Sequence, residues 1–526
     1  MLPFLNSTNA KSQKQIVAFR GLNLTDAYQD GDLVDGLNLS FRRFPYLSTR
    51  CGRKTVGSYY GATAMTARDK LVIVQGTGQL DENGVEVANL LYDDEVVGQV
   101  TAGDKQFAVV NTKMVIWPDK VYLDLNPASM ELKPLGASTS GTGATFATDS
   151  MTVSGWPDLT TVFVVGDTVT IGGCTTNAGN NKDVTITELT ATMIKAGKDV
   201  FTAGRESGTI TLERKIPDMD FICESENRLW GCSSKAQTIY ASAQGDPTNF
   251  FTYDVDTGSW AVAVGSEGDF TGCCKLASSV LFWKETKLHK VLGSYPSEYS
   301  VYSYDIEGLK KGCHKSIQVI NETLYYVGLH GVYTYTGNIP NLISAELGDR
   351  VMDDAVAGTD GDSYYLSSKS PIDAEGTIGI SMLVYDLQHR LWIREGGENV
   401  KDFARIGKDL YFLTPGFLYQ VESDEIAPGI EWSAQFCPFY ETIQGRKRYT
   451  RILMRVELPE GSWMMVGVRM DGGKQTWHNR LSSKKADVIP VQIPINRCDR
   501  FELTLRGQGP CTILGLSLEY QVGSDV

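Results

Sequence analysis

The sequence lacks long apolar runs, sustained helical periodicity and paired cysteines. No run of 18 apolar residues occurs in its 526 residues, and the N-terminal stretch contains no apolar segment long enough for a signal peptide. We therefore expect no membrane span and synthesis in a cytoplasm. The ten cysteines are scattered and form no CxxC pair. This scatter predicts mostly buried free thiols in a reducing compartment rather than disulfides or zinc ligands.

Catalytic and metal-binding signatures are also missing. The five histidines show no HxH, HExxH or HxxxH spacing, and the chain has no GxSxG, no GxxxxGK[ST] and no GxGxxG opening a helix. Acidic residues in "YDVDTG" (253–258) and "TDGD" (359–362) invite comparison with glycosidases or calcium loops, but acidic residues in turns are usually solvated. The sequence therefore predicts no catalytic residues, no metal, no cofactor and a protein that is not an enzyme.

An excess of basic residues is absent as well. The chain has 49 Lys and Arg against 63 Asp and Glu, a net charge of −14. An acidic surface argues against a protein that coats nucleic acid, because phosphate binding needs concentrated positive charge. What is abundant is glycine (53) and tyrosine (24), which favour strands joined by tight turns.

Short apolar runs separated by polar turns recur along most of the chain. Taking Leu229, Leu281, Leu324, Tyr365 and Leu410 as equivalent points gives spacings of 52, 43, 41 and 45 residues. Several strands per period of 40–50 residues are typical of β-propeller blades, which must stack because one hairpin cannot bury its apolar face alone. The tripeptide "RLW" at 228–230 fits a core position of such a blade, and its second copy at 390–392 fits a different strand. The best helical pattern is short, near 347–358.

The predicted fold is all-β: a propeller of about six or seven blades with an inserted small β-domain and a C-terminal β-sandwich-like region. At 526 residues the chain is too long for one core. A small-residue linker, "GASTSGTGATFATDS", opens the stretch that breaks the blade period, and long alternating strands follow residue 430. The predicted parts are an N-terminal arm (1–54), the first blade or blades (55–135), an inserted barrel or sandwich (136–216), the remaining blades (217–429) and a C-terminal sandwich or propeller-closing strands (430–526).

A basic and aromatic cluster ends the N-terminal arm. One interpretation is an ordered arm on the propeller, with arginines bound to backbone carbonyls. A second is a contact between subunits, since Arg and aromatic side chains are favoured interface anchors. Nucleic-acid contact along a pore is a third. The candidate interface residues are Arg42, Arg43, Phe44, Tyr46, Arg50 and Arg53.

Several motifs together suggest a family. The segment "GDLVDGLNLS" (Gly31–Ser40), with its Gly and the later Asn-Leu-Ser, leads to "FPYLSTR" (Phe44–Arg50), and "IYASAQGDPTNF" follows within 217–250. The stretches 281–299 and 312–335 also fit, so the likeness covers most of residues 19–425. The chain resembles the tailed-bacteriophage "stabilization protein" or tail-nozzle family of the head–tail connection.

This resemblance implies a structural virion protein at the tail or head–tail junction, made in the host bacterial cytoplasm. It implies a hexameric ring below the portal and adaptor that retains packaged DNA and conducts it during ejection. The expected partners are further copies of itself, the portal and adaptor, other tail proteins, and double-stranded DNA passing without sequence-specific contact. The alternatives are a tail-tip or fibre-associated propeller that binds host glycans and, less favoured, a propeller glycoside hydrolase.

Overall fold

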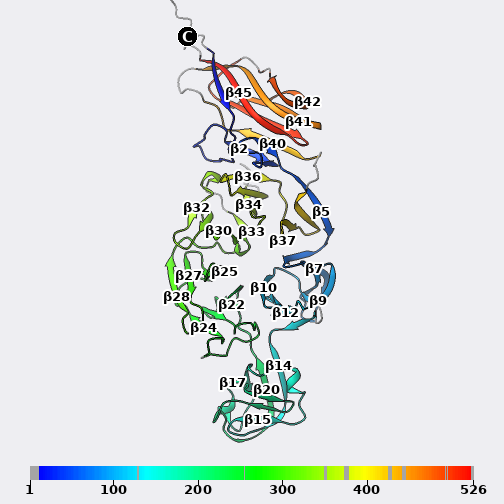
Figure 1. The fold of residues 1–526 in the computed structure, drawn as a ribbon, viewed down its shortest axis with the longest axis vertical. Coiled ribbons are helices and arrows are strands. Elements are labelled where there is room, and N and C mark those ends of the chain that lie inside the picture. The colour runs from blue at the N-terminus through cyan, green and yellow to red at the C-terminus, as the bar shows by residue number, and fades with distance from the viewer. Residues whose placement is uncertain are drawn as a thin grey trace, which may run out of the picture.

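A computed structural model describes residues 11–522 except 127–129, 254, 349–351, 372–377, 424–428, 441–445, 492 and 494–495. The described chain is built almost wholly from β-strands, with four short 3-10 helices: η1 (Leu159–Thr161), η2 (Ala178–Asn180), η3 (His314–Ser316) and η4 (Ala345–Leu347). None of the described helices is long and apolar enough to cross a membrane. The elongated molecule has a ring of sheets in its middle and a smaller sheet domain at each end (Figure 1).

Seven four-stranded antiparallel sheets form the ring, which is a seven-bladed β-propeller. The first strands of neighbouring blades contact one another, so these strands lie nearest the axis. Blade 1 consists of β6 (Ala62–Ala67), β7 (Leu71–Leu80), β8 (Glu86–Tyr92) and β9 (Glu95–Thr101). Blade 2 consists of β10 (Gln106–Val110), β11 (Lys113–Trp117), β12 (Val121–Asp124) and β13 (Leu132–Pro134). Blade 3 consists of β21 (Phe221–Ser225), β22 (Arg228–Ser233), β23 (Thr238–Ala241) and β24 (Trp260–Ala263).

The remaining blades continue the same order of strands from the axis outward. Blades 4 and 5 are β25 (Gly272–Leu276), β26 (Ser279–Trp283), β27 (Lys287–Leu292) and β28 (Ser300–Asp305), then β29 (Gln318–Ile320), β30 (Thr323–Gly328), β31 (Gly331–Tyr335) and β32 (Asn341–Leu342). Blade 6 is β33 (Asp353–Thr359), β34 (Ser363–Pro371), β35 (Ile378–Asp386) and β36 (Leu391–Glu395), and blade 7 is β37 (Asp402–Ile406), β38 (Asp409–Leu413), β39 (Phe417–Ser423) and β5 (Gly52–Ser58).

The sequence period corresponds to the blades. Leu229, Leu281, Leu324, Tyr365 and Leu410 all lie in the second strand of their blades and are at most 4% exposed. Burying one such side chain contributes roughly 1.5–3 kcal/mol, so each blade gains by stacking on its neighbours. The predicted all-β propeller is confirmed, with seven blades.

Strand β5 closes the ring from the far end of the sequence. It pairs antiparallel with β39, with Phe417 opposite Ser58 and Gln420 opposite Lys54, and becomes the outermost strand of blade 7. A strand from before the first blade therefore holds the last blade in place. Without it, β39 would present an unpaired edge.

The inserted domain lies between blades 2 and 3, at the lower end of Figure 1. Its seven strands form one sheet in the order β17-β16-β20-β14-β15-β19-β18 around a separate core that includes Phe146, Phe163 and Leu212. The strands are β14 (Ala137–Phe146), β15 (Ser150–Val153), β16 (Thr168–Gly172), β17 (Asp183–Thr185), β18 (Glu188–Thr190), β19 (Met193–Lys195) and β20 (Gly204–Arg214).

The opposite end of the molecule is a ten-stranded sheet that joins both ends of the chain, which we name the end domain. Strand β1 pairs with β45 and β2 pairs with β40, so residues expected to form an arm on the propeller instead enter this sheet. Its strands are β1 (Ser12–Ile16), β2 (Leu33–Leu37), β3 (Leu39–Ser40), β4 (Leu47–Thr49), β40 (Glu431–Phe436), β41 (Lys447–Met470), β42 (Thr476–Val491), β43 (Arg497–Cys498), β44 (Phe501–Gln508) and β45 (Thr512–Val522).

Two local expectations differ from the structure or are refined by it. Among the described residues of 347–358, the predicted helical pattern corresponds to the end of η4 and the strand β33, because pairing with β34 overrides a short local preference, while residues 349–351 lie outside the described residues. Leu391 and Trp392 of the second "RLW" begin β36, the outermost strand of blade 6, directly after Arg390, whereas the whole first copy lies in β22. The backbone oxygen of Trp392 accepts a hydrogen bond of 2.7 Å from the Leu22 amide, so the second copy holds the end domain on the propeller.

Candidate functional site

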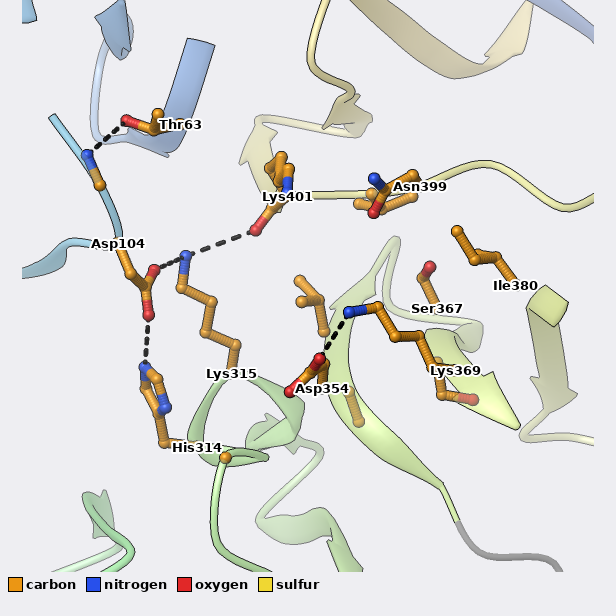
Figure 2. Close-up of a pocket in the computed structure, with 16 residues that line it drawn as sticks. Thr63, Asp104, His314, Lys315, Asp354, Ser367, Lys369, Ile380, Asn399 and Lys401 are labelled. Carbon is orange, nitrogen blue, oxygen red and sulfur yellow. Dashed lines mark hydrogen bonds and ion pairs between the residues drawn. The ribbon is translucent and has the colours of Figure 1, made fainter. Parts of the chain in front are cut away.

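A cavity of about 320 Å³ lies at the centre of the propeller, where the inner strands begin. Segments before or at the start of β6, β10, β29, β33 and β37 line it, so five blades contribute. These segments connect blades, and their polar side chains converge because the inner strands lie close to the axis. Figure 2 shows Thr63, Asp104, His314, Lys315, Asp354 and Lys401 around this cavity.

Lys315 forms the centre of a charged network that links blades across the axis. It precedes β29 of blade 5, and its Nζ lies 2.8 Å from Asp402 Oδ1 of blade 7 and in direct contact with Asp104, which precedes blade 2. His314 Nε2 lies 3.4 Å from Asp104 Oδ2. The amide of Met65, in blade 1, donates to Asp402 Oδ2 at 2.9 Å. Side chains therefore bridge the channel of the propeller.

The two carboxyl groups of this network have pKa values shifted in opposite directions. Burial raises the pKa of Asp402 to about 6, and the nearby Lys315 offsets only part of that shift. Burial would also raise the pKa of Asp104, but the hydrogen bond from His314 and the charge of Lys315 outweigh it and hold that pKa well below its usual range. For Lys315, burial is outweighed by Asp402 and Asp104, which raise its pKa. Lys315 is therefore a permanent cation between two different acids.

A second cavity of about 220 Å³ adjoins the first along the axis. Both cavities are lined by His314 and Lys315, and Asp402 lines the second. The second cavity is also lined by Lys105, whose Nζ lies 2.5 Å from Asp119 in a pair with almost no exposure to solvent. The Lys315 network thus stands between two polar chambers.

Two of the predicted interface arginines, Arg50 and Arg53, are used inside the chain. The side chain of Arg53 is 9% exposed, lies 3.1 Å from Glu395 of β36 and covers the ring of Phe412. Arg50 lies 3.9 Å from the same carboxylate and donates to the backbone oxygen of Cys51. Burial and the neighbouring Arg53 lower the pKa of Arg50 to about 10. These two arginines hold β5 and the turn before it against blade 6.

The other four predicted interface residues are partly exposed. Arg43 lies 2.8 Å from Glu457 and donates to Thr512, and Arg42 pairs with Glu422. Phe44 is 42% exposed and stacks on the imidazole of His389 with ring centroids 4.2 Å apart, while Tyr46 is 36% exposed. Their surfaces remain accessible to another chain, so a subunit contact at Arg42, Arg43, Phe44 and Tyr46 stays a prediction.

The "GDPTNF" loop joins the inserted domain to the propeller. Asn249 Nδ2 donates 3.0 Å to the backbone oxygen of Gly166 in the inserted domain. Asp246 lies 3.3 Å from Lys113 of blade 2 and accepts hydrogen bonds from Thr248. Phe250 is 1% exposed in the core shared by blades 2 and 3. The loop is a three-way joint between two blades and the insert.

Sequence inspection did not identify the central network. Lys315 lies 87 residues before Asp402 and more than 200 residues after Asp104, and no motif links the three residues. The only local signal is that each lies within about three residues of the start of an inner strand. Among the acidic stretches weighed earlier, Asp254 of "YDVDTG" lies outside the described residues. Among the described residues, no group of three or more His, Cys, Asp or Glu is arranged to hold a metal ion.

No family model and no curated protein matches the chain. Solved structures do match at low identity. The β-propeller domain of the Trilobed protease from Pyrococcus furiosus is 9% identical, with 70% of this chain and 94% of that chain covered and a TM-score of 0.28. The acylaminoacyl peptidase of Pyrococcus horikoshii is 10% identical, with 74% and 59% covered and a TM-score of 0.30. The exo-beta-1,3-galactanase of Phanerochaete chrysosporium is 8% identical, with 55% and 92% covered and a TM-score of 0.23.

The prediction that the chain is not an enzyme is corrected by this comparison. The matched structures include a galactanase, a peptidase and other glycoside hydrolases, so the exclusion of catalysis drawn from missing motifs is withdrawn. Motif searches find catalytic residues that are close in sequence, whereas a propeller assembles its central site from separate blades. At 8–10% identity these likenesses assign no activity to this chain.

Proposed function

We propose that the chain is a structural component of a tailed-phage virion, a nozzle or head-completion ring that retains packaged DNA and conducts it during ejection. The observation that carries this proposal is where the resembling segments lie. Gly31–Ser40 and Phe44–Arg50 supply strands and contacts of the end domain, and the "GDPTNF" loop joins the insert to two blades. The segments that resemble the nozzle family thus connect the three parts of the elongated molecule.

The bridged channel determines where DNA would pass. Lys315, Asp104 and Asp402 cross the centre of the propeller, so a duplex about 20 Å wide cannot thread one chain. The DNA would run through a bore between several copies, with propellers as the wall. A wall with an acidic surface repels phosphates and allows DNA to slide rather than bind.

Electron cryo-microscopy of the vertex of purified particles that contain this chain would test the proposal. We expect symmetric density below the portal and adaptor that fits a propeller flanked by two sheet domains, around a bore wide enough for duplex DNA. Quantitative mass spectrometry of the same particles should give a low multiple of the portal copy number.

Absence of the chain from purified particles would overturn the proposal. Density only at the tail tip or on fibres would move the function to host recognition, and saturable glycan binding by the isolated chain would support that alternative. Density at the tip or on fibres differs from a ring at the portal in its position along the tail, and glycan binding is measured separately on the isolated chain.

A second candidate function is hydrolysis in the central cavity. It is favoured by two carboxyl groups in contact with Lys315, Asp104 at the larger cavity and Asp402 at the smaller one, whose pKa values are shifted in opposite directions, as an acid and a carboxylate require. In a glycosidase, Asp402 would donate a proton and Asp104 would stay ionised. Turnover of aryl glycosides or bacterial polysaccharides that disappears in Asp104→Asn would support it. Equal rates for wild type and variant would eliminate it.

A further inference from the structure

The charges of the molecule are divided between its parts. Residues 1–54 and 430–526, which contain the end domain, carry 21 Lys and Arg against 14 Asp and Glu. The blades (55–135 and 217–429) carry 22 against 41, a net charge of −19. The whole-chain charge of −14 therefore hides a basic end and a strongly acidic middle.

A cluster of tryptophan and arginine lies on one face of the end domain. Along β41 the buried residues Met464, Val466 and Val468 alternate with outward-facing ones, so the outward face is not part of the core. On this face the guanidinium of Arg506 lies 3.9 Å from the ring centroid of Trp477, and that of Arg480 lies 4.5 Å from Trp463. We name Trp463, Trp477, Arg480 and Arg506 the Trp–Arg face.

The two arginines of this face have no acidic partner within the described chain. Arg480 and Arg506 are both exposed and make no ion pair with a described carboxylate. Nearby Arg469, by contrast, is paired with the buried Glu502. An Arg held flat on a Trp ring has lost much of its conformational freedom before any partner arrives, which lowers the entropic cost of binding.

Exposed cations extend this face along the same long strand. Arg448, Arg451 and Arg455 of β41 are exposed, so positive charge runs from the Trp–Arg face toward the start of the strand. Trp and Arg are the residues that most often dominate binding energy in protein interfaces. The combination predicts an acidic protein partner.

We propose that the Trp–Arg face of one copy docks on the acidic propeller of a second copy. The biological setting of this contact rests on the proposed ring. Two basic faces would repel each other, so the contact must join different surfaces of the two copies, and such head-to-tail contacts close into rings or extend as filaments. We identify the propeller of the second copy as the acceptor because it carries the excess of carboxylates.

Blade 4 offers the matching surface. Its outermost strand β28 has a free edge, and Tyr302 and Tyr304 on it are 48% and 44% exposed. Asp305 ends the same strand with its side chain 80% exposed and pairs with Lys287, and the exposed Glu298 lies just before the strand begins. Exposed tyrosines on an edge strand with a carboxylate near each of its ends complement a face of tryptophans beside arginines, and we assign β28 as the acceptor edge.

Sedimentation velocity of the purified full chain tests the contact. We expect concentration-dependent assembly at about 50 mM salt that dissociates at about 500 mM, because exposed charges are screened. Arg480→Glu with Arg506→Glu should lower the association constant at least about tenfold. Tyr302→Ala with Tyr304→Ala should weaken it similarly. The matched control, Arg205→Glu on an exposed arginine of the inserted domain, should assemble like wild type.

Three outcomes would overturn the proposal. These are a wild type that stays monomeric at about 50 μM in low salt, a Glu double variant that assembles like wild type, and a face that binds duplex DNA with no self-association. Unchanged assembly of the Tyr double variant would overturn the assignment of β28. Circular dichroism checks folding, and Trp477→Phe with Arg506→Gln replaces the Glu variant if that variant unfolds. Detection of the chain in particles is independent of all these results.

Discussion

The blades and the end domain contain the same kind of strand but place their charges differently. The propeller buries charged pairs near its axis, such as Lys315 with Asp402 and Lys105 with Asp119. The end domain packs Tyr449, Ile452 and Phe501 into an apolar core, and its buried charges Lys447 and Glu502 pair with the more exposed Asp499 and Arg469 at the edge of that core. Strands that converge on an axis bring polar turns into the centre, whereas packed sheet faces do not. The position of the polar turns relative to the core therefore determines where charged side chains become buried and paired.

The largest expected effect comes from removing the cation of the central network. Lys315→Met leaves Asp104 without its cation and Asp402, which is only 8% exposed, without a counter-charge. We expect the free energy of unfolding of the propeller to fall by about 3–5 kcal/mol. Urea denaturation measures this loss, and adding Asp402→Asn to the variant should recover part of it. A single variant within about 1 kcal/mol of wild type would mean that the network does not hold the blades.

Acid should weaken the propeller through His289. The imidazole is 1% exposed, bonded to Ser266 and Ser303, and burial with help from Lys284 and Lys287 lowers its pKa from 6.5 to about 4. Between these values the unfolded chain binds a proton that the folded chain does not. The stability contributed above pH 6.5 is therefore lost as pH falls toward 4, by up to about 3 kcal/mol.

Urea unfolding at pH 7 and pH 4.5, with wild type and His289→Gln, measures this contribution. The drop in stability between the two pH values should be smaller in the variant. Equal drops in both proteins would show that the folded chain admits the proton at this site.

A smaller effect is expected from the apolar core of the end domain. Ile452 is 0% exposed, and Ile452→Val removes one methylene, which should cost about 0.5–1.5 kcal/mol. Ile452→Thr, close in shape to valine, buries a hydroxyl as well and should cost roughly 1–3 kcal/mol more. Calorimetry that follows the end-domain transition distinguishes the two. Equal losses of stability in Ile452→Val and Ile452→Thr would indicate that water reaches this core. The core of the end domain would then be less apolar than the comparison with the propeller requires.

The smallest effect is expected from an exposed pair in the same cavity as Lys315. Lys369 Nζ lies 2.7 Å from Asp354, with side chains 47% and 63% exposed. Lys369→Ala should change stability by less than about 1 kcal/mol, because solvent screens such a pair. Urea denaturation of Lys369→Ala and Lys315→Met under the same conditions provides the matched comparison. A loss above about 2 kcal/mol would show that burial is not what distinguishes the two lysines.

The propeller could be predicted from the sequence because each blade is made of hairpins between neighbouring segments. Leu229, Leu281 and Leu324 repeat with the blade for that reason. The closure could not be predicted, because β5 pairs with β39 more than 350 residues away and pairing at that distance leaves no periodic signal. The same holds for Asp104, Lys315 and Asp402, which meet only after the ring has formed. Local sequence patterns therefore predict the blades, whereas the central network consists of residues that only the assembled ring brings together.

The strand that closes the ring also sets an order of events during synthesis. Residues 52–58 leave the ribosome first, but their partner 417–423 is made some 360 residues later. At roughly 5–20 residues per second, β5 waits roughly 20–70 s for β39. Strands β1 and β2 wait longer still, since β45 and β40 come at the end of the chain. A chain that ends before residue 417 would therefore carry six complete blades and an unpaired β5, with open strand edges that invite aggregation.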